Sequence, residues 1–167
     1  MTCIVVMGVA GCGKSTFGQE LAIELNLPWI EGDDCHSAAS KAKMAAGTPL
    51  MDADREGWLL TLCEQMRKNP AGCVIGCSAL KRSYRDTLRQ AGYVRFAYLR
   101  LTREEAQRRV SSRAGHFFSD TLVSSQFAAL EDPSQEPGVI ALDATEATTA
   151  LVRQVRVALQ SAMDQVK

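Results

Sequence analysis

The hydrophobic pattern divides the chain into short apolar runs that alternate with longer amphipathic segments. The runs are almost continuously apolar, which is typical of buried parallel strands, and they cover residues 3–7, 28–30, 72–78, 94–101 and 139–142. Between them, apolar residues recur at helical spacing, as at Phe17, Leu21 and Leu25. The alternation predicts an α/β fold in three layers, with about five parallel strands and helices on both faces.

The expected helices follow these strands in turn. They run from the first turn to about residue 25, and then over 38–46, 52–69, 79–91, 102–113, 119–130 and 151–162. Thr102 and Glu105 form the signature of a capping box, and Leu122 is expected to face the core together with Phe127 and Leu130. No repeat, low-complexity tract or long linker divides the chain, so residues 1–167 are expected to form one domain.

A glycine-rich turn follows the first apolar run. Its residues Gly8, Gly13, Lys14 and Ser15 fit the template G-x-x-x-x-G-K-[ST], between a strand and a helix as the phosphate-binding loop (P-loop) requires. Glycines let backbone N–H groups approach phosphate oxygens, and the dipole of the following helix favours the same anion. Lys14 is expected to reach the β- and γ-phosphates of ATP, and the Ser15 hydroxyl to ligate Mg²⁺. The expected nucleotide-binding residues of this P-loop NTPase fold are Gly8, Val9, Ala10, Gly11, Cys12, Gly13, Lys14, Ser15 and Thr16.

Composition limits the possible classes of protein. The 167 residues include 19 Lys plus Arg and 19 Asp plus Glu, so the net charge is zero, whereas nucleic-acid-binding proteins are usually basic. No stretch approaches the roughly 20 apolar residues of a membrane span. We therefore expect neither a nucleic-acid partner nor a membrane. The six cysteines contain no C-x-x-C pair, which favours reduced thiols in a cytoplasmic protein over a zinc site.

Acidic residues gather where the strands are expected to end, which is the ligand-binding edge of such a sheet. Asp33 follows the second strand and could accept a hydrogen bond from an attacking hydroxyl. A helix cap or a solvated turn explains Asp33 equally well, and Asp34 fits the cap better. Asp52, Asp54 and Arg55 lie at the start of the next helix. A helix cap explains one of the two aspartates, and the other aspartate together with Arg55 could recognise hydroxyls.

Basic residues occur in pairs near two of the other strand ends. Lys81 and Arg85 are four apart on one helix face and suit an anionic substrate group, although a solvated face is the simpler interpretation. Arg109 and Arg113, also four apart, are positioned to close over the phosphates of ATP in a short helical lid at about 109–130.

Together these segments resemble the small P-loop gluconokinases, in order and spacing, from the first strand to about residue 133. The most specific segments are Ser78-Ala79-Leu80-Lys81 and Gly115-His116-Phe117-Phe118. The others are residues 8–15, Gly32-Asp33 with His36, Pro49-Leu50 followed by Asp52, Asp54, Arg55 and Trp58, Tyr84-Arg85-Asp86, and Gln126-Phe127 followed by Leu130-Glu131 and Pro133.

The resemblance implies phosphorylation of D-gluconate to 6-phosphogluconate with ATP and Mg²⁺, in a fold related to shikimate and nucleoside-monophosphate kinases and typically in a homodimer. It implies that Asp33 is the general base and that Lys14 and Arg113 assist the transfer, with Arg109 and Arg113 at the nucleotide. The implied gluconate-binding residues are Asp33, His36, Asp54, Arg55, Lys81 and Arg85.

Two alternatives stay open at this point. Another small-molecule kinase of this fold, of the shikimate or nucleoside-monophosphate type, would share the phosphate loop. A shikimate kinase would, however, want a glycine-rich turn where this chain has Cys77-Ser78-Ala79-Leu80-Lys81. A nucleotide-binding module without transfer activity would need neither Asp33 nor the basic helix and lid arginines, so their joint presence counts against it.

Overall fold

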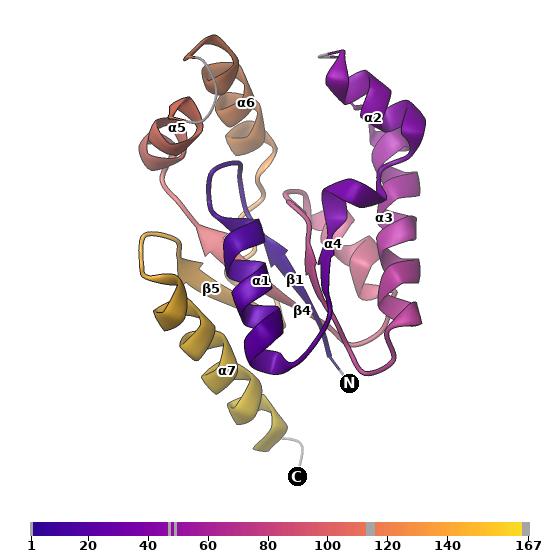
Figure 1. Ribbon diagram of the computed structural model, residues 1–167, viewed down its shortest axis with the longest axis vertical. Coiled ribbons are helices and arrows are strands. Elements are labelled where there is room, and N and C mark those ends of the chain that lie inside the picture. Colours follow the sequence, from indigo (N-terminus) through magenta and orange to yellow (C-terminus); the bar gives the residue numbers. More distant parts are fainter. Residues whose placement is uncertain (1, 47, 49, 113–115, 165–167) are drawn as a thin grey trace.

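The computed structural model describes residues 2–46, 48, 50–112 and 116–164, and a five-stranded parallel sheet lies at its centre (Figure 1). The strand order is β2-β3-β1-β4-β5. The strands are β1 (Cys3–Met7), β2 (Trp29–Glu31), β3 (Val74–Gly76), β4 (Val94–Arg100) and β5 (Val139–Asp143). β1 is central because it pairs with β3 on one side and with β4 on the other.

Helices join successive strands and cover both faces of the sheet (Figure 1). They are α1 (Lys14–Leu25), α2 (Ala38–Ala45), α3 (Asp52–Lys68), α4 (Arg82–Arg89), α5 (Arg103–Ser111), α6 (His116–Ala129) and α7 (Thr148–Asp164), with a 3₁₀ turn η1 (Gly32–Cys35) after β2. This arrangement confirms the predicted three-layer α/β fold with about five parallel strands. Among the helices described, none is long and apolar enough to cross a membrane.

Alternation along β1 builds the two cores. Ile4 and Val6 lie in a cluster with side chains of α1 and α7, whereas Val5 and Met7 lie in a cluster with side chains of α3 and α4. All four side chains are essentially inaccessible to solvent. Burial of each contributes about 1.5–3 kcal/mol relative to exposure, which explains why a strand covered on both faces has a continuously apolar sequence.

Two helices depart from the expected boundaries or faces. α4 begins at Arg82, because Ala79 adopts a left-handed conformation (φ 47°) and Lys81 is extended. The expectation that Leu122 faces the core was wrong: 43% of Leu122 is exposed, and the next residue, Val123, is buried instead. The expectation that Asp34 caps a helix was also wrong, because Ser37 is the N-cap of α2 and accepts from the Ser40 N–H.

Two arms extend beyond the carboxyl ends of the strands (Figure 1). One is the hairpin of α5 and α6, and the other is α2 with the start of α3. The turn after β1 lies between them. The α5–α6 arm has a small apolar cluster of its own, in which Val9 from this turn contacts Leu80, Ala106 and Val123.

Candidate active site

The turn after β1 has the backbone of a phosphate cradle. Gly8, Gly11 and Gly13 all have positive φ, and α1 begins at Lys14 directly after them. At Gly11 a Cβ would also lie 3.1 Å from Val110 and 3.3 Å from the Ala106 carbonyl, so close approach of α5 requires glycine there. The first N–H groups of α1 have no acceptors within the helix, and together with the positive end of the helix dipole they favour an anion at this turn.

The two polar side chains of the motif have partners within the site. The Lys14 ammonium donates to the carbonyls of Gly8 (3.1 Å) and Val9 (3.2 Å), so it lies folded along the loop. The Ser15 hydroxyl donates to the Glu31 carboxylate at 2.7 Å. A serine hydroxyl beside a carboxylate is an all-oxygen donor set, which suits Mg²⁺. The residues present therefore fit both a nucleotide phosphate and its cation.

The acidic turn η1 follows Glu31 immediately and is anchored by contacts with β3 and α3. Gly32 contacts β3 so closely that a Cβ would lie 1.9 Å from the Gly76 carbonyl. The indole N–H of Trp58 donates to the Gly32 carbonyl at 2.7 Å. Asp33 lies on this anchored turn with its residue exposed, so its carboxylate is available to a ligand at the strand ends.

His36 directly follows η1, and its side chain is buried against α3. Its ring stacks on Trp58 with 4.3 Å between ring centroids, and 8% of the residue is exposed. Burial lowers the pKa of His36, so the imidazole is neutral at pH 7. Within the described residues its Nδ1 atom has no hydrogen-bond partner. The geometry gives His36 a packing contact behind Asp33, and direct substrate binding by His36 stays a prediction.

A polar cluster between the starts of α3 and α4 includes two of the expected substrate residues. The Asp52 carboxylate accepts from the Tyr84 hydroxyl (2.8 Å) and from Lys81 (3.3 Å), and Arg55 lies 3.7 Å away. The hydrogen bond from Tyr84, followed by that from Lys81, lowers the pKa of Asp52. Asp52 in turn raises the pKa of Lys81. Arg55 and Lys81 thus both lie at the Asp52 carboxylate on a partly exposed surface, and their expected role at the substrate stays a prediction.

Asp54 lies beside this cluster but is already engaged. Its carboxylate pairs with Lys43 of α2 at 2.8 Å and accepts from the Met51 N–H at 2.9 Å. These two contacts lower its pKa. Asp54 therefore joins helix α2 to the start of α3 within this arm. Its expected role at substrate hydroxyls stays a prediction.

Arg85 requires a correction, because the structure does not place it with Lys81. Its guanidinium is fully buried, pairs with Glu136, and donates to the carbonyls of Ala79, Leu80 and Glu131. Glu136 is 51 positions away in the sequence and 11% exposed. With these donors occupied, Arg85 supports the turn that carries Lys81 and does not reach a substrate in this structure.

Arg109 lies at the phosphate loop, and its expected role at the nucleotide stays a prediction. It donates to the Gly11 carbonyl at 3.4 Å and to the Ala144 carbonyl, after β5, at 3.0 Å. Glu105, one turn earlier, pairs with it at 2.7 Å. Hydrogen bonds from Arg108 and Arg109 lower the pKa of Glu105 to about 2. Arg113, the other expected lid arginine, lies outside the described residues.

Sequence reasoning missed several residues that the fold brings to this edge. Glu31 was given no role, and Tyr84 and Gln126 were named only within family segments, also without a role. Gln126 accepts from the Ala10 N–H at 2.6 Å, across 116 positions of sequence. Only the family-like segments around these residues signalled them, because spacing does not reveal contacts between distant elements.

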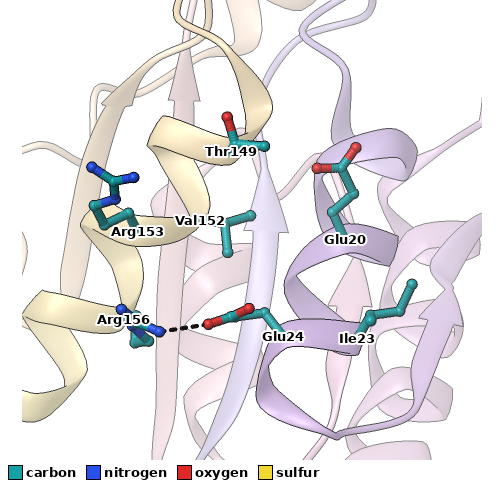
Figure 2. A pocket seen from close by; sticks show the side chains of 7 residues that line it. All are labelled: Glu20, Ile23, Glu24, Thr149, Val152, Arg153 and Arg156. Atoms are coloured by element: carbon teal, nitrogen blue, oxygen red, sulfur yellow. Dashed lines mark hydrogen bonds and ion pairs between the residues drawn. The ribbon is translucent and has the colours of Figure 1, made fainter.

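A hollow lies between α1 and α7, away from the phosphate loop, and has a volume of about 400 Å³ (Figure 2). Figure 2 shows Arg156 directed at Glu24, and the two side chains pair at 2.8 Å. The seven lining residues are Glu20, Ile23, Glu24, Thr149, Val152, Arg153 and Arg156. None of them belongs to the phosphate loop or to η1, so this groove is separate from the candidate active site.

Comparisons with known proteins agree with this geometry. Residues 3–137 match the AAA domain family. A probable gluconokinase from Schizosaccharomyces pombe is 42% identical over 142 residues, covering 79% of this chain and 74% of the relative. The thermosensitive gluconokinase of Escherichia coli is 38% identical, covering 93% and 86%. The crystal structure of a gluconokinase from Sinorhizobium meliloti 1021 superposes with a TM-score of 0.89 at 37% identity, covering 99% of this chain and 95% of that one.

Proposed function

This chain belongs to the gluconokinase family, and from that premise we propose that it transfers the γ-phosphoryl group of ATP to a hydroxyl of D-gluconate. The products are ADP and 6-phospho-D-gluconate. One structural observation supports the proposal independently of the family: the phosphate loop lies at the same edge of the sheet as the basic residues Arg55 and Lys81. The Gly8 N–H donates to the Ser78 carbonyl, three residues before Lys81, and so joins the two.

In this proposal the loop and its neighbours hold the nucleotide. The glycine-rich backbone and the start of α1 bind phosphate oxygens, and Lys14 leaves its two carbonyls to meet the β- and γ-phosphates. Ser15 and Glu31 supply oxygen ligands for Mg²⁺, either directly or through water. When bound, Mg²⁺ would neutralise charge on the β- and γ-phosphates. Arg109 adds a cation at the Gly11 side.

The acceptor side depends on Asp33 and the cluster around Asp52. Asp33 accepts the hydrogen bond of the attacking hydroxyl and orients it toward the γ-phosphorus, because it follows Glu31 on an anchored turn. Lys81 and Arg55 attract the carboxylate of the sugar acid, and Tyr84 offers a hydroxyl to its polyol chain. The α5–α6 arm acts as a lid that excludes water, which would otherwise accept the phosphoryl group.

The first test of this function is ADP production from ATP and Mg²⁺ with gluconate, shikimate, AMP, CMP or no acceptor. We expect turnover with gluconate only. Binding of ATP without turnover on gluconate would contradict the substrate and leave the phosphate loop in place.

A second test addresses the carboxylate site through Lys81→Met. Loss of a charge-assisted hydrogen bond is expected to raise the KM for gluconate about 10- to 100-fold and to change the KM for ATP little. Lys68→Met, at an exposed position at the end of α3, is the matched control. A larger effect on the KM for ATP would place Lys81 at the nucleotide instead.

We also infer a cytoplasmic homodimer. Support comes from the free thiols of all six cysteines and from large apolar side chains on the surface, among them Ile23 (80% exposed) and Met51 (68% exposed). Light scattering coupled to size-exclusion chromatography measures the mass directly. A mass of one 18.2 kDa chain at micromolar concentration would contradict the dimer.

A further inference from the structure

Gln126 of the α5–α6 arm contacts the phosphate loop through its side-chain amide. The Ala10 N–H donates to its Oε1 at 2.6 Å. Two other contacts fix the arm at the same place: Arg109 on the Gly11 carbonyl, and Val9 against the apolar cluster of α5 and α6. Gln126 is therefore held at the loop by packing on either side.

Position 10 is the middle of the cradle, between Gly8 and Gly13. Amides that turn inward in such a loop are the groups that meet phosphate oxygens. A side chain bonded to the Ala10 amide consequently lies where the terminal phosphoryl group is expected.

The chemistry of the glutamine amide then determines what it offers. A backbone N–H must be met by an acceptor, so Oε1 faces Ala10 and Nε2 keeps two N–H donors. Among the residues whose side chains the structure describes, Nε2 makes no hydrogen bond. The planar amide thus places a neutral donor beside an anion site, at a partly buried position.

We propose that Gln126 is a further catalytic residue, whose carbonyl holds the Ala10 amide while its NH₂ group donates to an oxygen of the transferred phosphoryl group. The acceptor hydroxyl gives its proton to Asp33 as its oxygen forms the new bond to phosphorus, and the bond from phosphorus to the β–γ bridging oxygen breaks and leaves ADP. Gln126 transfers no proton. Its fixed donor stabilises charge on the phosphoryl oxygens as the lid closes. This inference rests on the proposed function for its use of ATP but not for the identity of the acceptor.

The decisive variant is Gln126→Glu, because glutamate keeps the acceptor for Ala10 and replaces only the donor. Isothermal titration would measure its affinity for Mg²⁺-ADP and for Mg²⁺ with the non-hydrolysable analogue adenylyl imidodiphosphate. We expect affinity for the analogue to fall at least about tenfold, as for loss of a hydrogen bond to a charged group, while affinity for ADP changes much less. Gln126→Met, which lacks both groups, should also weaken the analogue selectively. Ser125→Ala, at the adjacent exposed position, should match the wild type.

Two results would overturn the proposal. If Gln126→Glu binds the analogue as tightly as the wild type does, Gln126 only holds the Ala10 amide in place. Equal losses for ADP and the analogue in both variants would mean that it shapes the whole loop. With gluconate as acceptor, kcat of Gln126→Glu should fall about 10²- to 10³-fold at an unchanged KM for gluconate. If the wild type does not use gluconate, the proposed function fails while the nucleotide titration still decides the role of Gln126.

Discussion

Asp33 is the residue on which the proposed chemistry depends most directly. It is exposed on η1, and the turn is anchored by Trp58 on the Gly32 carbonyl. Asp33→Asn keeps the shape of the side chain but removes the acceptor charge, so we expect kcat to fall about 10²- to 10⁴-fold. Nucleotide affinity should change little, because the phosphate loop is untouched. Steady-state rates and a nucleotide titration measure both quantities.

Asp34→Asn is the matched control for this prediction, since Asp34 is the adjacent aspartate and is also exposed. It should retain most of the rate. A large loss in Asp34→Asn with full activity in Asp33→Asn would transfer the proton-acceptor role to Asp34.

Cys3 allows a second test at the residue scale, independent of catalysis. The Cys73 thiol donates to Cys3 Sγ at 3.7 Å and lowers the pKa of Cys3 to about 7, from an ordinary 9.0. A lower pKa means more thiolate at neutral pH, so Cys3 should be the fastest-reacting thiol toward a disulfide reagent, with half-maximal rate near pH 7. Cys3→Ser should remove this phase and Cys35→Ser should not, because burial raises the pKa of Cys35. A fast phase with a midpoint near 9 would contradict the assignment.

Lys81 and Arg85 illustrate what spacing can and cannot predict. Four residues apart, they were expected to share a helix face, yet Lys81 precedes α4 and stays exposed enough to meet a ligand, whereas Arg85 is fully buried. The difference comes from Glu136, which the fold brings under α4 from 51 positions away. No local pattern contains that partner. The phosphate loop was predictable because all its chemistry lies within nine consecutive residues.

At the scale of the element, α4 depends on this buried ion pair. Arg85→Met removes the cation but leaves Glu136 in a site that is 11% exposed, and it also leaves the Ala79 and Leu80 carbonyls without their donor. We expect a loss of about 3–5 kcal/mol in the free energy of unfolding, measured with urea. Arg82→Met, on the exposed side of the same helix, should change it by less than about 1 kcal/mol. Similar losses in both variants would contradict the structural role of Arg85.

The same pair predicts how stability depends on pH. Hydrogen bonds from Arg85, followed by those from Arg89, lower the pKa of Glu136 to about 2, below its ordinary 4.5. The contribution of Glu136 is therefore complete above pH 4.5 and is lost as the pH falls from 4.5 toward 2. Glu136→Gln should flatten the pH dependence of the unfolding free energy in this window. An unchanged slope would show that other carboxylates dominate acid unfolding.

At the scale of the whole molecule, the sequence predicted the layers and the number of strands and gave the expectation of a short helical lid at about 109–130, but it did not predict how the arms contact the rest of the molecule. Continuous apolar runs are sufficient to predict buried strands, since β1 contributes Ile4 and Val6 to one core and Val5 and Met7 to the other. The α5–α6 arm has only a small cluster around Val9 and Ala106, and its contacts to the loop join distant positions. For this reason the sequence did not identify the buried face of α6, and Leu122 was wrongly expected to face the core.

That separate, small cluster predicts where ligands change the dynamics. Segments with few buried contacts open with low free energy, so amides in α5 and α6 should exchange faster than those in β1 and β4 of the free protein. A bound ligand at 100 times its Kd adds about 2.7 kcal/mol, which slows exchange up to about 100-fold where opening breaks the site. We expect this protection in α5 and α6 when Mg²⁺, the ATP analogue and gluconate are bound. We expect none in α7, which lines the hollow between α1 and α7 (Figure 2). Protection confined to α7 would place the ligand-responsive surface in that groove and would contradict the role of the arm as a lid.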